Sequence, residues 1–226
     1  MNSKFKTIFF TLVSLLVFLV AACPASAQTL NSPEALKEYL DKQPANTPDK
    51  PIMVSMGAND LMLRRIVFVL MTTGKYVSLN LTGNALTTIP DYAFQECFTL
   101  TAITIPNSVT TIGYNVFYGC TNLSSITIPN RVTSILGSAF QGCTSLSSVT
   151  IPSSVTKIVH YAFWDCTSLT SVTFQGTVNI FGNASENAFD GDLFAKFYVT
   201  DASNGTPGTY TTSAPVTSSS VWTLQH

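Results

Sequence analysis

The sequence reads LTAITIPNSVTTIGYNVFYGCTN from Leu100 to Asn122, LSSITIPNRVTSILGSAFQGCTS from Leu123 to Ser145, and LSSVTIPSSVTKIVHYAFWDCTS from Leu146 to Ser168. These segments are three copies of one 23-residue unit, and they follow one another without a gap. One such unit cannot bury its apolar side alone, so consecutive units must stack on each other. The stretch therefore predicts a solenoid.

Each unit opens with the pattern of a half-buried strand. In the first copy Leu100, Ile103 and Ile105 point to one side, with small or polar residues between them. Pro106 then ends the strand, because proline has no N–H to donate to a continuing ladder. Two further apolar pairs, Val109/Ile112 and Val116/Phe117, predict two more inward corners. We expect parallel strands about 4.8 Å apart, with short turns or helical segments opposite them.

Four cysteines recur at one position of consecutive units: Cys97, Cys120, Cys143 and Cys166. A zinc site needs every sulfur about 2.3 Å from the metal, whereas four rungs place the outer two roughly 14 Å apart. Side chains in a column also lie side by side, which disfavours disulfides. The pattern predicts buried free thiols that pack as small hydrophobes, with no metal and no cofactor.

Residues 1–27 have the composition of an export signal. Lys4 and Lys6 precede an apolar run from Ile8 to Val20, which is too short to span a membrane, and small residues follow it.

Two cleavage sites are possible, one before Cys23 and one after Ala27. Val20-Ala21-Ala22-Cys23 resembles the bacterial lipobox, in which the cysteine becomes a lipidated first residue. Ala25-Ser26-Ala27 before Gln28 has the pattern of an ordinary signal-peptidase site. We favour the lipoprotein, because Cys23 is the one cysteine outside the repeats. The chain is then expected at the cell surface or outer membrane, or alternatively as a secreted or periplasmic protein.

Charge argues against nucleic-acid partners. The leader holds two of the 11 basic residues, so the remainder carries nine against 12 acidic residues, a net charge of −3. Electrostatic attraction to phosphate is not expected at this balance. Membrane contact is expected only through a lipid at Cys23.

We expect an N-terminal α/β cap over residues 28–75. Ser32 and Pro33 begin a helix of about three turns, and 52–56 can form a strand. Asn59 then caps a second helix, Asp60–Thr73, which Gly74 ends. Two sets of side chains on this helix are expected, a set that covers the first coil (Met62, Ile66, Val69 and Leu70) and an outer set (Arg64, Phe68 and Met71).

The repeats are expected over 76–192 and a C-terminal β cap over 193–226. In the last unit Gln175 replaces proline and Asp192 stands where cysteine would be, which marks the end of an array. A strand is expected over 195–199. Segments 208–211 and 221–224 are expected to pair as a closing hairpin, with 211–220 as a mobile loop.

The first coil carries the leucine-rich repeat pattern LxLxxNxLxxI at Leu79, Leu81, Asn84, Leu86 and Ile89. The sequence pattern of the later coils, ITIPxSVTxIxxxAFxGCTSL, resembles the BspA-type leucine-rich repeats of bacterial cell-surface proteins. The resemblance covers roughly residues 76–192. It implies a curved leucine-rich-repeat solenoid and export. In several members it also implies attachment to host extracellular-matrix proteins or to other bacteria.

No catalytic constellation is present in the sequence. The two histidines, His160 and His226, have no credible nucleophile or metal partner, and GxSxG, HExxH and glycine-rich phosphate motifs are missing. We do not expect an enzyme.

Two surfaces are candidates for binding. The first consists of aromatic residues at variable repeat positions: Tyr92, Tyr114, Tyr118, Tyr161 and Trp164. One of these positions reads Gln95, Tyr118, Gln141 and Trp164 in turn, so we expect it to face solvent. The second is a hydroxyl array on the strands: Thr104, Ser125, Thr127, Ser148, Thr150, Ser171 and Thr173.

Exposed Tyr and Trp dominate protein–protein hot spots, which favours a protein-binding adhesion module that uses the aromatic residues. The alternatives are a structural envelope protein without a specific ligand, and a carbohydrate-binding module that uses the same aromatic residues.

Overall fold

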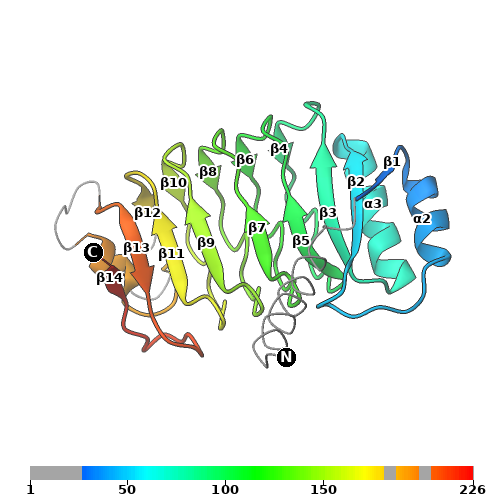
Figure 1. The fold of residues 1–226 in the computed structure, drawn as a ribbon. Coiled ribbons are helices and arrows are strands. Elements are labelled where there is room, and N and C mark those ends of the chain that lie inside the picture. The colour runs from blue at the N-terminus through cyan, green and yellow to red at the C-terminus, as the bar shows by residue number, and fades with distance from the viewer. Residues whose placement is uncertain (1–26, 181–186, 199–204, 226) are drawn as a thin grey trace, which may run out of the picture.

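The computed structural model describes residues 27–180, 187–198 and 205–225. Residues 1–26 of the predicted leader, with Cys23, lie outside the described residues. The described chain forms an elongated stack that begins with two helices and ends with a hairpin (Figure 1). No helix in these ranges is both long enough and apolar enough to cross a membrane.

Parallel strands run along two sides of the stack. The strand face is formed by β3 (Val77–Thr82), β5 (Leu100–Thr104), β7 (Ser125–Thr127), β9 (Ser148–Ile151) and β11 (Ser171–Phe174). A second sheet contains β4 (Thr88–Ile89), β6 (Thr111–Ile112), β8 (Ser134–Ile135), β10 (Lys157–Ile158) and β12 (Asn179–Ile180). Equivalent residues pair one unit apart, for example Ile112 with Ile135. The predicted solenoid with parallel strands at the repeat period is confirmed.

A column of phenylalanines fills the third corner of the coils. Phe94, Phe117, Phe140, Phe163 and Phe189 are all buried and stack face to face. Successive ring centroids lie 5.3, 5.1, 4.8 and 4.8 Å apart. Stacked aromatic pairs add attraction beyond the burial of their apolar area. This column runs through the core from the first coil, at Phe94, to the last, at Phe189.

The cysteines form a second column, and the prediction of buried free thiols is confirmed. The thiol of Cys143 donates to the carbonyl oxygen of Phe117 at 3.2 Å, and Cys166 repeats this contact to Phe140 at 3.1 Å. Burial raises the pKa of the Cys143 thiol, because the charged thiolate cannot be solvated there. The cysteines therefore serve as packing groups.

The N-terminal segment extends the strand face. It contains β1 (Gln28–Leu30), α2 (Pro33–Asp41), β2 (Ile52–Gly57) and α3 (Asp60–Thr73), and β2 pairs in parallel with β3. Both predicted helix caps are present: Ser32 Oγ accepts from the N–H of Ala35, and Asn59 Oδ1 from that of Met62.

The buried face of α3 is broader than predicted. Leu63 and Val67 are buried beside Ile66, Val69 and Leu70, whereas Met62 is only partly buried. The prediction assumed that α3 buries only the face toward the first coil. The helix packs between α2 and the first coil, so it contacts both and buries more of its surface.

The C-terminal segment differs from the prediction at one element. Residues 193–197 form the short helix α4 (Leu193–Phe197), so the expected strand over 195–199 is wrong. Leu193 and Phe197 are both buried, and their spacing of four residues places them on one helical face.

The predicted closing hairpin is confirmed as β13 (Gly208–Thr211) paired antiparallel with β14 (Thr223–Gln225). β13 also pairs antiparallel with β11 and so ends the parallel array. The connecting segment is held against the last coil, contrary to the expected mobile loop. Val216 is 3% exposed, and its N–H donates to the carbonyl of Thr167 at 2.7 Å.

Asp190 makes the stability of this end dependent on pH. Its side chain is 5% exposed, and burial raises its pKa from 3.8 to about 6, although its carboxylate accepts a hydrogen bond from the N–H of Asp165 at 2.6 Å. The folded state therefore binds the proton of the Asp190 side chain more tightly than the unfolded state does. The associated stability is fully present below the unfolded pKa and is lost as pH rises through about 6.

We therefore expect the melting temperature to fall between about pH 4 and pH 6 more in the natural protein than in Asp190→Asn. Asparagine can still accept from Asp165 but does not ionise. Thermal unfolding across this range checks the prediction. Identical pH profiles for the two proteins would contradict it.

Candidate functional site

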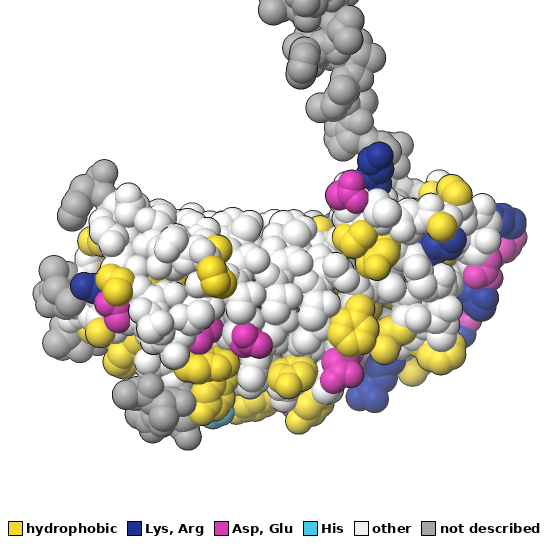
Figure 2. Space-filling view, turned by 90° about the horizontal axis from the view of Figure 1, so that it is seen from below, with side chains coloured by type: hydrophobic (Ala, Val, Ile, Leu, Met, Phe, Trp, Pro, Cys, Tyr) yellow, Lys and Arg dark blue, Asp and Glu magenta, His cyan; other side chains and the backbone are white. Residues whose placement is uncertain are grey.

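The aromatic edge, defined as Tyr92, Tyr114, Tyr118, Tyr161 and Trp164, lies on the segments between the second sheet and the cysteine column. Seen from below, hydrophobic side chains are frequent along the lower border of the molecule, whereas the middle of the face above it is largely white (Figure 2). Tyr92 is 57% and Tyr114 42% exposed. The other three are half-buried, so the expectation that the position of Tyr118 and Trp164 faces solvent is wrong.

The structure divides the aromatic edge into two groups. Tyr92 and Tyr114 lie on adjacent coils, where the N–H of Tyr92 donates to the carbonyl of Tyr114 at 2.9 Å. Tyr118 lies on the same coil as Tyr114. In the other group Tyr161 meets Trp164 edge to face, with ring centroids 5.7 Å apart.

His160 belongs to the second group, although no sequence pattern indicated this. Its ring lies edge-on to Tyr161 at 5.6 Å. A Cβ atom on Gly137, one coil earlier, would lie 3.2 Å from His160 Nε2. The imidazole therefore lies against the glycine of the coil that separates the two groups.

Two tyrosines of the aromatic edge have a backbone conformation that is unfavourable for bulky residues. Tyr92 and Tyr161 have φ of 62° and 60°, in the left-handed region, and the same repeat position holds Asn115 and Ser138 at 53° and 56°. Asparagine tolerates this region, whereas a bulky residue there costs about 1 kcal/mol or more. Tyr92 recovers little of this cost by burial, because most of its side chain is exposed.

Tyr92→Asn is therefore expected to leave the free energy of unfolding unchanged or to raise it by up to about 1 kcal/mol. Urea denaturation measures the change. The matched control is Asn115→Tyr at the equivalent position, which should lower stability by a similar amount. A clear loss of stability in Tyr92→Asn would show that the tyrosine serves packing instead.

The strand face is the second candidate surface. Thr104, Ser125, Thr127, Ser148 and Thr150 are exposed, as the alternation of the strands predicts. Ser171 and Thr173 are half-buried, since β13 pairs beside them and Thr173 Oγ1 lies 2.8 Å from Thr209 Oγ1. This second surface is uncharged and rich in hydroxyl groups.

The strand face is interrupted between β7 and β9, both of which are fully described. β7 closes one sheet and β9 closes the next, with no ladder between them. The N–H of Ser124 donates to Thr101 and that of Thr170 to Ser147, but between these two pairs the structure shows no hydrogen bond from Ser147 to Ser124. The second sheet stays continuous behind the break.

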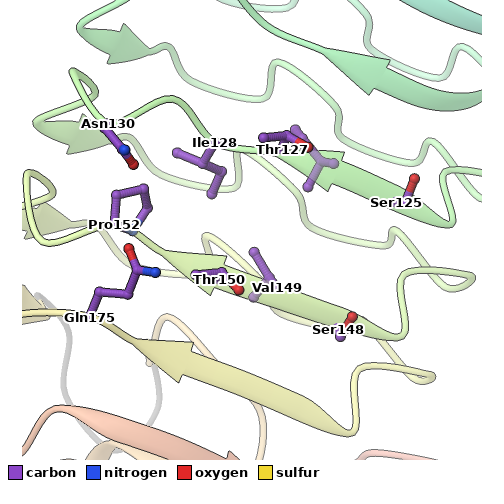
Figure 3. Close-up of a pocket in the computed structure, with 10 residues that line it drawn as sticks. Ser125, Thr127, Ile128, Asn130, Ser148, Val149, Thr150, Pro152 and Gln175 are labelled. Atoms are coloured by element: carbon purple, nitrogen blue, oxygen red, sulfur yellow. The ribbon is translucent and has the colours of Figure 1, made fainter. Parts of the chain in front are cut away.

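A hollow of about 340 Å³ lies over this break (Figure 3). Ser125, Thr127, Ser148 and Thr150 line it from the two strands, and Asn130 and Gln175 lie at one end. The opening also uncovers Ile126, which is only partly buried, whereas the equivalent Ile103 and Val149 are 2% and 4% exposed. The sequences of the two strands are almost identical, so they do not indicate the hollow.

Residues 75–201 match the pattern of the BspA type leucine rich repeat region in six copies, which covers more than half of the chain. The chain belongs to the BspA type leucine-rich repeat family. The family consists of bacterial surface proteins whose repeats serve protein–protein interaction. No curated protein matches the chain.

Several solved bacterial structures are similar to this BspA-type chain. A leucine-rich repeat protein of T. pallidum is 30% identical over 42% of this chain and 57% of its own, with a TM-score of 0.37. One from Bacteroides ovatus is 30% identical over 64% of this chain and 33% of its own, with a TM-score of 0.42. A leucine rich cell surface protein of Faecalibacterium prausnitzii is 22% identical over 66% of this chain and 43% of its own, with a TM-score of 0.39. The chain thus spans between a third and three-fifths of the length of these proteins.

Outside the repeats, this BspA-type chain exposes apolar side chains on α3. Leu61, Phe68 and Met71 are 76%, 66% and 50% exposed. The placement of Phe68 and Met71 on the outer face is as predicted. A hollow of about 360 Å³ lies between α2 and α3 beside Phe68, next to the ion pair of Arg65 with Glu34.

Proposed function

We propose that this chain is an exported interaction module that attaches its cell to a protein of a host matrix or of another bacterium, with the aromatic edge as the contact surface. The observation that carries the proposal is the placement of Tyr92, which is 57% exposed, at a left-handed backbone position. Strain that burial does not offset points to a role outside folding.

The composition of the aromatic edge supports contact with a protein. Tyr and Trp are the residue types that contribute most to binding at protein interfaces, particularly where they cluster. Tyr118 and Trp164 stand two coils apart, roughly 10 Å along the stack at the usual strand spacing. His160 lies against Gly137 of the coil between them. One partner can therefore contact both groups.

The location is part of the proposal. Residues 1–27 form the leader, and cleavage before Cys23 would leave a lipidated cysteine that anchors the protein to a membrane, with the repeats exposed. Cleavage after Ala27 would instead release a secreted or periplasmic protein. A surface location agrees with the family, whose members are typically bacterial surface proteins.

The aromatic edge weighs against a purely structural role. An envelope protein without a ligand would gain nothing from a tyrosine that is both exposed and strained, as Tyr92 is, since asparagine occupies the same position in the next coil.

A binding panel of the purified protein against matrix proteins, bacterial cells and glycans tests the proposal. We expect saturable binding to at least one protein or cell type. Binding to glycans, with none to any protein or cell, would overturn the proposal.

A further inference from the structure

We propose that the hollow between β7 and β9 binds a neutral sugar residue of a glycan, at a site separate from the aromatic edge. Ser125 and Thr127 face Ser148 and Thr150 across the hollow (Figure 3). The hollow is therefore bordered by hydroxyl groups on two sides and by amides at one end.

The polar groups of the hollow match the chemistry of a sugar. Each hydroxyl can donate and accept, and so can the amides of Asn130 and Gln175, as sugar hydroxyls also do. Figure 3 shows these two amides turned toward one another beside Pro152. The missing ladder between β7 and β9 also leaves backbone N–H and C=O groups that need partners. A ring carrying several hydroxyls can satisfy groups on both strands at once.

Charge and size limit the ligand further. None of the residues that line the hollow is charged, so nothing there would pair with a sialylated or sulfated glycan. A volume of about 340 Å³ is at the small end of ligand sites, which run from about 300 to 1,000 Å³. The partly exposed side chain of Ile126 offers an apolar contact for one side of a sugar ring. A single neutral sugar residue suits these limits.

A peptide strand suits the hollow less well. Strand addition needs a free sheet edge with open space beside it. Here β7 and β9 flank the break, and they are held in place by the continuous second sheet behind them. β7 and β9 are both sheet edges, but the space of about 340 Å³ over the break has a fixed strand on each side and suits a compact polyol better than an extended peptide.

The test begins with the full chain on an array of neutral, sialylated and sulfated oligosaccharides. The neutral oligosaccharide that binds best is then titrated calorimetrically into the natural protein and four variants. Thr150→Val and Gln175→Leu remove polar groups from the hollow. Thr104→Val makes the same change as Thr150→Val on the exposed face of β5, outside the hollow. Trp164→Ala alters the aromatic edge.

We expect binding to neutral glycans, weakened on the order of tenfold by Thr150→Val through the loss of a hydrogen-bonding hydroxyl. Gln175→Leu should act in the same direction, and Thr104→Val and Trp164→Ala should have no effect. The inference is overturned if no neutral glycan binds, or if Thr104→Val weakens binding as much as Thr150→Val. It is also overturned if Trp164→Ala abolishes glycan binding, because the sugar would then lie on the aromatic edge.

Discussion

Phe140→Ala is expected to lower the free energy of unfolding by about 3–5 kcal/mol. Phe140 is fully buried and lies in the middle of the phenylalanine column, with ring centroids 5.1 Å from Phe117 and 4.8 Å from Phe163. Truncation removes the apolar area of the ring and both stacking contacts. The cavity cannot close by a small shift, because the coils above and below are fixed by strand pairing.

Urea denaturation measures this loss, with Phe140→Leu as the control. Leucine keeps most of the apolar volume, so it should cost less than alanine, about 1–2 kcal/mol. A loss below about 1 kcal/mol for the alanine variant would mean that the column contributes little to stability.

Trp222→Ala is expected to cost a similar amount, about 3–5 kcal/mol. Trp222 is 1% exposed and is one of the largest buried side chains at the C-terminal end of the stack. Its indole N–H donates to the carbonyl of Asp190 at 3.0 Å, and its backbone N–H to Asp192 Oδ1 at 2.7 Å. A solenoid end without its cover exposes the core of the last coil.

The neighbouring residue supplies the control for Trp222→Ala. Val221 is 64% exposed, so Val221→Ala should change stability by less than about 0.5 kcal/mol. Hydrogen exchange locates the effect: protection in β11 and β13 should fall first in the tryptophan variant. Equal stability of the two variants would contradict the assigned role of Trp222.

The structure could be predicted best from the sequence where the repeat is strict. The columns of Phe140 and Cys143 follow from identical spacing in consecutive units, since each side chain must fit the one below it. The caps of α2 and α3 were also predictable, because Ser32 and Asn59 act on backbone groups a few residues away.

The predictions were wrong where contacts between residues distant in the sequence determine the local structure. The expected strand over 195–199 is a helix, because Leu193 and Phe197 lie on one helical face and are buried, with Phe197 against Phe174 of the last coil. Trp164 was expected in solvent, yet Tyr161 packs against its edge. The break between β7 and β9 occurs in almost identical sequences, so only the arrangement of the strands shows the hollow. His160 is part of the candidate site because its ring lies beside Tyr161 and against Gly137 of the neighbouring coil.

The most direct test of the central claim compares the two surfaces against the same partner. Using a protein or cell type that the panel identifies, binding is measured for Trp164→Ala and for the double variant Thr127→Lys with Thr150→Lys. Because Trp164 is half-buried, thermal unfolding first establishes that its variant is folded. We predict that Trp164→Ala weakens binding by about 2 kcal/mol or more, whereas the lysine variant binds normally. Loss of binding in the lysine variant, with Trp164→Ala unaffected, would place the partner on the strand face and contradict the account.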